Sequence, residues 1–569
     1  PPTAAPFLER PDRLPLVGRH AELRELLRQL ESAMQGAGGL TLVRGEAGVG
    51  KTRLLSELES NAQWRGVRTL WGLCYELADP PAYQPLIEVL RAEITSLQQS
   101  SLGSLWRVEL ARLLPEMEIG DAIPTSLEPE EERRRLSEAI VRAFLALSQT
   151  EPCLILLESA QWMDVTSLET LRYLLPRLTN APLMVVITVR PEELRGRQAR
   201  IVSTLEGTLL PRRLELGRLK LSAAEELVAH ALGLEQPAPI FSARLHKETE
   251  GNPFFLIETL RSLVDEGLLY RDEEGDWSTP WDEETTNYAE LPLPASVLQS
   301  IERRLDRLSS RQSELLSLAA IIGRSVTFDL WHLAGEIAAG DLLDVGDELC
   351  RRGLLLAGET GVGEADYVFA HDQVRRVAHD RLGAPRRRLY HQRVAEALER
   401  LAPNNAEALA YHWTESRIWD KAVDYHRLAG ERARVVYANE NAVAHFGKAL
   451  ESLDHLRGAE DTVLRYELHL ARERVRDLQG EREAQAKDLA MLAGLARQLG
   501  DDQRQAEVAL RQAHYADRTS DYPAAIAAAE QAICFSQTVP DLSTEVEVLI
   551  YRGKALTQQG GYESAQSQL

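Results

Sequence analysis

Short apolar runs alternate with amphipathic stretches along residues 16–215. The runs at 40–44, 67–73, 154–157 and 183–189 have the length and aliphatic composition of buried β-strands, and stretches with helical periodicity separate them. Strands that are separated by helices pair in parallel, because each connection must cross over the sheet. We therefore predict that residues 16–215 form an α/β domain with a parallel sheet.

The pattern changes after the predicted sheet. Residues 216–275 follow a helical periodicity and are predicted to form a helical domain. Residues 276–294 are polar and contain prolines, so we interpret them as a linker. Residues 295–386 combine helices with two short apolar stretches, at 353–357 and 367–370. Helices that are followed by a small hairpin are compatible with a winged-helix domain.

Residues 387–569 lack strand signals and form amphipathic helix rich in alanine and leucine. Similar groups recur at Ala442, Ala484, Ala525 and Ala565, about 40 residues apart. This period, with small residues at helix contacts, predicts stacked helical hairpins of the tetratricopeptide kind, whose usual period is about 34 residues. A helical bundle without repeats is the alternative interpretation.

The two ends of the sequence favour a piece of a longer protein. Residues 1–15 are proline-rich and are interpreted as a linker. The chain starts at Pro1 without a methionine and ends inside the helical pattern, so we expect the repeats to be truncated. Its 569 residues exceed what one hydrophobic core usually serves, which also predicts several domains.

The charge, the apolar runs and the cysteines of the chain bear on whether it binds nucleic acid, a membrane or zinc. The chain has 65 Lys and Arg against 87 Asp and Glu, a formal charge of −22, so a broad basic face for nucleic acid is not expected. No apolar run reaches the roughly 20 residues of a membrane span. The four cysteines are scattered without a C-x-x-C pair, which argues against a zinc site or disulfides and favours the cytoplasm.

A glycine-rich loop joins the first predicted strand to a helix. The segment Gly45-Glu-Ala-Gly-Val-Gly-Lys51-Thr52 matches the P-loop pattern G-x-x-x-x-G-K-[ST]. Gly48 and Gly50 allow the backbone to curl so that its N–H groups point at phosphate oxygens, and the positive end of the helix adds to this attraction. Lys51 supplies a positive charge to the β and γ phosphates, and Thr52 supplies a hydroxyl for Mg²⁺.

These features predict a site for ATP or ADP with Mg²⁺. A chance match is disfavoured, because strand, loop and helix follow one another in the required order. The nucleotide-binding residues that we assign to this segment are Gly45, Gly48, Val49, Gly50, Lys51, Thr52 and Arg53.

An acid at the end of a neighbouring strand is needed to complete the Mg²⁺ shell. The apolar run at 153–158 ends in Glu158, which is therefore the candidate catalytic and metal-binding acid; a surface glutamate is the alternative. Ser159 follows, where many ATPases of this type have a second acid that polarises the attacking water. Serine is a weak base, and Asp164 is expected mainly to orient its loop, so we predict slow or absent hydrolysis.

Arg190 follows the apolar run at 183–189 and places a cation at the predicted sheet edge. An arginine there could sense the γ-phosphate, so we include it among the candidate catalytic residues. The alternative is a structural salt bridge with Glu192 or Glu193.

Several motifs occur together in a fixed order. They are Leu16-Val17-Gly18-Arg19, the P-loop with Arg53 after it, Gln161-Trp162-Met163-Asp164, Gly251-Asn252-Pro253-Phe254-Phe255 and Phe369-Ala370-His371-Asp372. In this order they resemble the STAND class of signal-transduction ATPases, and most closely the bacterial regulators that join such an ATPase to tetratricopeptide-like repeats. Large ATP-binding LuxR-type activators, antibiotic regulatory proteins and some class III nucleotide cyclases have this module.

The resemblance implies roles for four more residues. Val17 and Arg19 would line the adenine and ribose. Pro253 would pack on the adenine, with a proline at a helix start as the alternative. His371 would contact the β-phosphate of ADP in a closed state, with a capped helix start as the alternative. The departure from the family is Ser159, where Asp is common, and it bears on hydrolysis rather than on binding.

The resemblance also implies a two-state switch. ADP would keep the nucleotide-binding, helical and winged-helix domains closed. Exchange for ATP, helped by a protein or small-molecule inducer on the repeats, would open the module and expose an oligomerising surface. The winged helix would act as an internal lid, so no direct contact with nucleic acid is expected from these residues.

The favoured function is control of transcription, with the output domain outside this sequence. The alternatives are a defence or cell-death sensor with an N-terminal effector enzyme, and the regulatory region of a class III nucleotide cyclase. A motor-type AAA+ ATPase is disfavoured, because it needs a second acid at the position of Ser159.

Overall fold

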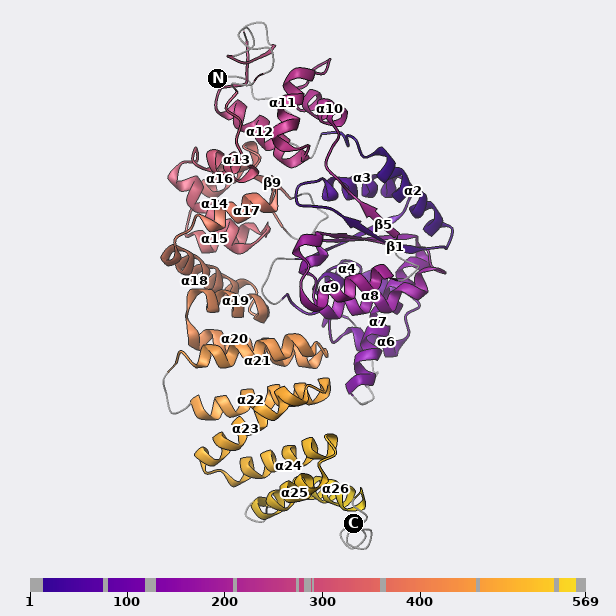
Figure 1. Ribbon diagram of the computed structural model, residues 1–569, viewed down its shortest axis with the longest axis vertical. Helices are drawn as coiled ribbons and strands as arrows, with labels where there is room; N and C mark the ends of the chain where they lie inside the picture. The colour runs from indigo at the N-terminus through magenta and orange to yellow at the C-terminus, as the bar shows by residue number, and fades with distance from the viewer. Residues whose placement is uncertain are drawn as a thin grey trace. The chain divides into compact units, whose positions relative to one another are not determined.

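The computed structural model describes residues 14–74, 80–117, 129–207, 212–272, 276–280, 288, 291–358, 365–456, 461–536 and 542–558 (Figure 1). Most of the predicted linker at 1–15, part of the one at 276–294, and Ala565 lie outside these residues. The chain divides into two compact units, residues 1–125 with 134–404 and residues 126–133 with 405–569. Each unit is described by itself.

A five-stranded parallel sheet lies in the first unit, with the strand order β2-β3-β4-β1-β5. The strands are β1 Gly39–Arg44, β2 Arg68–Leu73, β3 Cys153–Glu158, β4 Leu183–Val189 and β5 Arg212–Glu215. The predicted parallel α/β fold is confirmed, and four strands lie at the apolar runs. Strand β5 is not among the predicted strands, because its Arg-Arg-Leu-Glu sequence is polar and lies largely exposed at the sheet edge.

Helices pack on both faces of this sheet, α2 and α3 on one and α8 on the other (Figure 1). Leu154 and Leu156 of β3 share a buried cluster with Leu54 and Leu58 of α3, as alternate residues of a strand should. The helices around the sheet are α2 His20–Met34, α3 Lys51–Trp64, α4 Gln84–Ala92, α5 Ile94–Gln99, α6 Ser104–Leu110, α7 Pro129–Thr150, α8 Val165–Leu178 and α9 Gly196–Gly207, with short 3₁₀ turns η2 Ala160–Trp162 and η3 Pro191–Glu193.

Three helices follow the sheet, where a helical domain is predicted. They are α10 Leu221–Leu232, α11 Pro239–Thr249 and α12 Pro253–Asp265. Their apolar faces form one core, which Leu14 and Val17 from the start of the chain also join. A two-stranded hairpin pairs β6 Tyr270–Arg271, at the end of the predicted helical segment, with β7 Trp277–Ser278, at the start of the predicted linker.

The rest of the first unit combines helices with a small antiparallel sheet of order β8-β10-β9. The helices are α13 Val297–Leu305, α14 Ser310–Ile322, α15 Phe328–Gly335, α16 Ala339–Arg351, α17 Asp372–Asp380 and α18 Ala384–Leu401; the strands are β8 Ser325–Val326, β9 Leu355–Ala357 and β10 Tyr367–Phe369. This arrangement is compatible with a winged helix, which stays a prediction. Helix α18 packs on α14 and α15, so it belongs with this part of the chain.

The described part of the second unit is helical. Its helices are α19 Ala406–Ser416, α20 Trp419–Val435, α21 Asn439–Leu453, α22 Asp461–Gln479, α23 Arg482–Leu499, α24 Asp502–Arg518, α25 Tyr522–Ser536 and α26 Leu542–Gln558, and each packs on the next. Ala442, Ala484 and Ala525 lie near the starts of α21, α23 and α25, which are every second helix. The predicted helical repeats are therefore confirmed. Within the described ranges, no helix of either unit is long and apolar enough to cross a membrane.

A buried ion group joins α12 to the elements that follow it. Glu258 is 1% exposed and pairs with Arg261 at 2.9 Å and with Arg304 of α13. Arg261 and Arg304 also donate to the carbonyls of Gly353 and Arg352. Burial opposes the ionisation of Glu258, but Arg304 and Arg261 outweigh it and lower its pKa below the usual range.

We predict that Glu258→Ala destabilises the first unit by about 3–5 kcal/mol, because two buried guanidinium groups lose their counter-charge. Since the pKa of Glu258 is lower in the folded chain than in the unfolded chain, its contribution is present above about pH 4.3 and is lost as the pH falls below that value. Urea unfolding at neutral and acidic pH measures both effects. The control is Glu336→Ala, which removes an exposed partner of Arg393. Equal unfolding midpoints for the two variants would contradict the prediction.

Candidate functional site

The carboxyl ends of three neighbouring strands meet at one edge of the parallel sheet. The P-loop leaves β1 after Arg44, Glu158 ends β3, and Arg190 follows β4. Strand β4 lies between β1 and β3, so the strand order brings these three segments together. In open α/β sheets this is the edge at which ligands bind.

Two glycines of the P-loop have backbone conformations that other residues rarely adopt. Gly48 has a φ of +78° and Gly50 a φ of +100°, and α3 begins directly after Gly50. A Cβ atom on Gly48 would lie 2.9 Å from Asn252 Oδ1 and 2.9 Å from the Cβ of Phe254. Gly48 is therefore required both by its own backbone and by the close approach of a second segment.

Consecutive carbonyl groups of the loop each accept a hydrogen bond, and the donors come from different parts of the chain. Lys51 Nζ donates to the carbonyls of Gly45 (2.6 Å) and Glu46 (2.8 Å), Asn252 Nδ2 to Ala47 (3.0 Å), the N–H of Phe254 to Gly48 (3.3 Å), and Arg19 Nη2 to Val49 (3.2 Å). With the carbonyls bound in this way, the N–H groups of the same loop can face an anion.

The Lys51 ammonium lies between the loop and a cation at the sheet edge. Burial, followed by the nearby Arg190, lowers the pKa of Lys51 to about 8. Carboxylates around the site, among them Glu192 and Glu158, oppose this shift only in part. An anion bound in the loop would favour the charged form of Lys51, because its negative charge would add to that of the nearby carboxylates.

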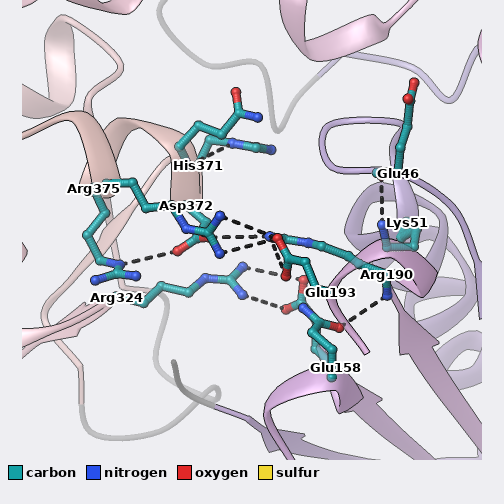
Figure 2. Close-up of polar contacts among 12 residues, drawn as sticks. Glu46, Lys51, Glu158, Arg190, Glu193, Arg324, His371, Asp372 and Arg375 are labelled. Carbon is teal, nitrogen blue, oxygen red and sulfur yellow. Dashed lines mark hydrogen bonds and ion pairs between the residues drawn. The ribbon is translucent and has the colours of Figure 1, made fainter. Parts of the chain in front are cut away.

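Glu158 is buried at the end of β3 and has two partners. The hydroxyl of Thr52 donates to Glu158 Oε1, so the two predicted oxygen ligands of Mg²⁺ are adjacent. Arg324 binds the same carboxylate, with Nη1 3.2 Å from Oε2 and Nη2 3.4 Å from Oε1 (Figure 2). A hydroxyl and a carboxylate are hard oxygen donors, so the residues present fit Mg²⁺. Thr52 and Glu158 would hold the ion, which would neutralise charge on the phosphates.

The residues after Glu158 are engaged in local structure. Ser159 has a φ of +65°, and its N–H donates to Thr188 Oγ1 at 2.9 Å. Asp164 caps α8, accepting from the N–H of Ser167 at 2.9 Å and from the hydroxyls of Thr166 and Ser167. Burial raises the pKa of Asp164 although these hydrogen bonds oppose it. This geometry agrees with the interpretation that Asp164 orients its loop.

Arg190 takes part in ion pairs that reach across the sequence. Its Nη1 lies 3.1 Å from Glu193 Oε1 and 3.4 Å from Asp372 Oδ2 (Figure 2). Asp372 also binds Arg375 Nε and Arg376 Nε, each at 3.2 Å. The alternative interpretation of Arg190 was a structural salt bridge, and this salt bridge is present with Glu193. Asp372, at the start of α17, is a second partner of Arg190.

His371 caps α17 and stacks on Phe254, with ring centroids 3.6 Å apart and an angle of 16° between the planes. Its Nδ1 accepts from the N–H of Gln373 at 3.2 Å. Burial, followed by the charge of Arg190, lowers the pKa of His371 to about 3, so the imidazole is neutral at physiological pH. The helix-cap interpretation is therefore realised, and the ring lies against a residue that binds the P-loop.

Val17 and Arg19 connect the start of the chain to this site. Val17 is buried in the core of α10 to α12. Arg19 is 6% exposed, and besides Val49 it donates to the carbonyl of Gly217. Burial lowers the pKa of Arg19, with Glu22 opposing the shift.

Pro253 and Arg53, the other two residues predicted to bind the nucleotide, have structural roles in the helices α12 and α3. Pro253 occupies the first turn of α12, after Asn252, whose side chain caps the helix by accepting from the N–H groups of residues 254 and 255. Arg53 donates to the carbonyl of Leu14 at 3.0 Å and pairs with Glu57 at 3.0 Å. Their proposed contacts with a nucleotide stay predictions.

Four residues of the site, Asn252, Phe254, Arg324 and Asp372, are not among those predicted from the sequence. Asn252, Phe254 and Asp372 belong to the motifs at 251–255 and 369–372, but the sequence does not show which residues they contact. Arg324 belongs to no motif. Its only signal is a charge between the end of α14 and a short strand, Ser325–Val326.

Comparison with known proteins identifies a family domain that contains the P-loop and Glu158. Residues 15–186 match the family model of the AAA ATPase domain. An uncharacterized protein of Rhizobium meliloti (strain 1021) is 23% identical over 439 residues, which cover 74% of this chain and 41% of that protein. Hybrid signal transduction histidine kinase G of Dictyostelium discoideum is 30% identical over 110 residues, 19% of this chain and 3% of that protein. The chain thus spans less than half the length of either relative.

A solved structure from Pyrococcus horikoshii is similar over 98% of this chain and 77% of its own, with 16% identity and a TM-score of 0.44. It is a signal transduction ATPase with numerous domains (STAND) that has a tetratricopeptide repeat sensor. The P-loop at Gly45–Thr52 lies inside the residues that match the AAA ATPase domain, a nucleotide-binding domain. Residues 15–186 therefore match the AAA ATPase domain, and helical repeats follow it along the chain, which is the combination that the predicted resemblance to the STAND class implies.

Proposed function

We propose that this chain is a regulatory switch in which bound ADP or ATP decides whether two distant segments stay against the P-loop. The stack of His371 on Phe254 carries the proposal, because Phe254 itself donates to the carbonyl of Gly48. A ligand that changes the P-loop therefore acts on both segments at once.

The charges around Arg190 support unequal binding of the two nucleotides. Arg190 is paired with Glu193 and Asp372, and Asp372 begins α17 directly after His371. The γ-phosphate of ATP would compete with Asp372 for Arg190, whereas ADP has no such group. ATP would thus weaken the contact of α17, and ADP would leave it in place, which is the differential interaction that a switch needs.

The helical repeats and the resemblance to the STAND class support a wider role for this switch. We propose that the switch controls transcription through an output domain outside this sequence, and that it works in the cytoplasm. The helical repeats would bind a protein or small-molecule inducer, since stacked hairpins present extended surfaces for partners. Opened chains would form homo-oligomers.

The first test is Lys51→Ala. The loss of charge-assisted hydrogen bonds to phosphate is expected to cost about 3 kcal/mol or more, which weakens ADP and ATP binding at least a hundredfold. Titration calorimetry measures the affinity, and Lys247→Ala, an exposed lysine of α11, is the matched control. Unchanged affinity in Lys51→Ala would refute the site.

The pKa of Lys51 predicts a pH dependence of binding. Because this pKa is about 8 in the chain and a bound phosphate raises it, affinity is expected to vary little between about pH 7, where the nucleotide phosphates are fully ionised, and that pH, and to fall above it. Calorimetry at about pH 9, in two buffers of different ionisation enthalpy, should reveal proton uptake on binding, and at about pH 7 little. Lys51→Arg keeps its charge throughout this range, so its affinity should lack this dependence; a parallel decline in both proteins would contradict the assignment.

The role of His371 is tested with two substitutions. His371→Ala removes the stack, worth about 1 kcal/mol, and is expected to weaken ADP binding several-fold and favour an open or oligomeric form. His371→Phe keeps the stack but removes the ring nitrogens, so it separates closure from a contact with the β-phosphate. Light scattering measures the mass, and His379→Ala near the other end of α17 is the control. Unaltered mass and ADP affinity in both His371 variants would show that His371 has no part in the switch.

A further inference from the structure

Arg324 holds the carboxylate that the metal site needs. Its two terminal nitrogens lie 3.2 Å and 3.4 Å from the two oxygens of Glu158, and Figure 2 shows the side chain extended toward that carboxylate. Glu158 Oε1 also accepts from the hydroxyl of Thr52. Both oxygens of Glu158 are therefore bound by donors, and one of these donors is a cation from a segment far away in the sequence.

The backbone of Arg324 couples this contact to His371. The carbonyl of Arg324 accepts from the N–H of Phe369 at 2.9 Å, and β8 pairs with β10 directly beside it. Phe369 ends β10, and His371 follows after a single residue. The small sheet is therefore connected directly to two parts of the site, the Arg324 side chain and the start of α17. A movement of this sheet would displace both.

A guanidinium and Mg²⁺ make incompatible demands on Glu158. Mg²⁺ needs oxygen ligands at about 2.0–2.1 Å in octahedral geometry, either directly or through its waters. A carboxylate in a forked pair with arginine already has its oxygens directed at N–H groups. A divalent cation beside Thr52 would also lie close to the fixed positive charge of Arg324 and be repelled by it.

We propose that Arg324 takes the place of Mg²⁺ at Glu158 in this closed arrangement, so that the closed chain binds its nucleotide without the metal. Entry of Mg²⁺ with ATP then requires Arg324 to leave Glu158, and the small sheet leaves with it. The metal, and not only the γ-phosphate, thereby becomes a signal for opening. This inference rests on the proposed nucleotide switch and assigns its regulation to one ion pair.

The test compares the affinity of the full chain for ADP with Mg²⁺ and with a chelator in its place, by titration calorimetry. For the original chain the two affinities should agree within about twofold. In Arg324→Ala, Glu158 is released, and Mg²⁺ should tighten ADP binding by about tenfold or more, a usual size for coupling between two sites. Arg311→Ala is the matched control, because Arg311 is an exposed residue of α14 that pairs with Glu314.

Two further variants locate the effect. Arg324→Lys keeps a charge but loses the fork, so its response to Mg²⁺ should lie between those of the original chain and Arg324→Ala. The double variant Glu158→Gln with Arg324→Ala should lose the response, because a carboxamide is a poor ligand for Mg²⁺. If Arg324→Ala does not fold, as judged by its thermal transition, Arg324→Lys alone carries the comparison.

The outcomes separate this inference from the switch on which it rests. The same response to Mg²⁺ in the original chain and in Arg324→Ala would overturn the role of Arg324 while leaving nucleotide binding intact. A response that persists in the double variant would overturn the competition at Glu158. Absence of ADP binding under both conditions in the original chain would overturn the switch and this inference together.

Discussion

The peptide groups of the P-loop impose a constraint on which the whole site depends. To bind an anion the loop must direct its N–H groups inward, and its carbonyl groups then need partners elsewhere. Those of Gly45 to Val49 are all bound, by Lys51, by the segment at 252–254 and by Arg19. Three of these donors, Arg19, Asn252 and Phe254, lie outside the loop and its helix. The conformation of the loop therefore depends on the segments that contain these donors.

The electrostatics of the site add a second coupling. Glu158, Glu193 and Asp372 are each paired with arginines, and the arginines Arg190 and Arg324 lie at the sheet edge. Such partly buried pairs bring little net stability, because desolvation offsets much of their attraction. Such pairs can exchange partners at a small net cost in free energy. A phosphate can replace the carboxylate that binds an arginine, and a metal ion can replace the guanidinium that binds a carboxylate. Two arrangements of similar free energy are what a switch requires.

The sequence predicted what local chemistry determines. The strands with apolar runs, the P-loop and Glu158 at a strand end were recognised because each has its own pattern of residues. The polar strand β5 was missed, because an exposed edge strand needs no apolar run. The pairs Arg190 with Asp372 and Glu158 with Arg324 join residues 182 and 166 positions apart, and nothing in the local sequence of either partner specifies the other. Long-range charge pairing is set by the packing of the domains, which periodicity does not reveal.

The strand end at Glu158 also indicates how long a bound nucleotide would persist. Ser159 holds a left-handed backbone conformation, which is strained for a residue other than glycine, and its N–H is bound by Thr188. A serine hydroxyl at that place cannot accept a proton from water at neutral pH. Both oxygens of Asp164 already accept hydrogen bonds from the cap of α8, and moving this carboxylate would uncap that helix. This geometry supports the prediction of slow turnover, which would suit the proposed switch, because its signal would then last as long as its nucleotide.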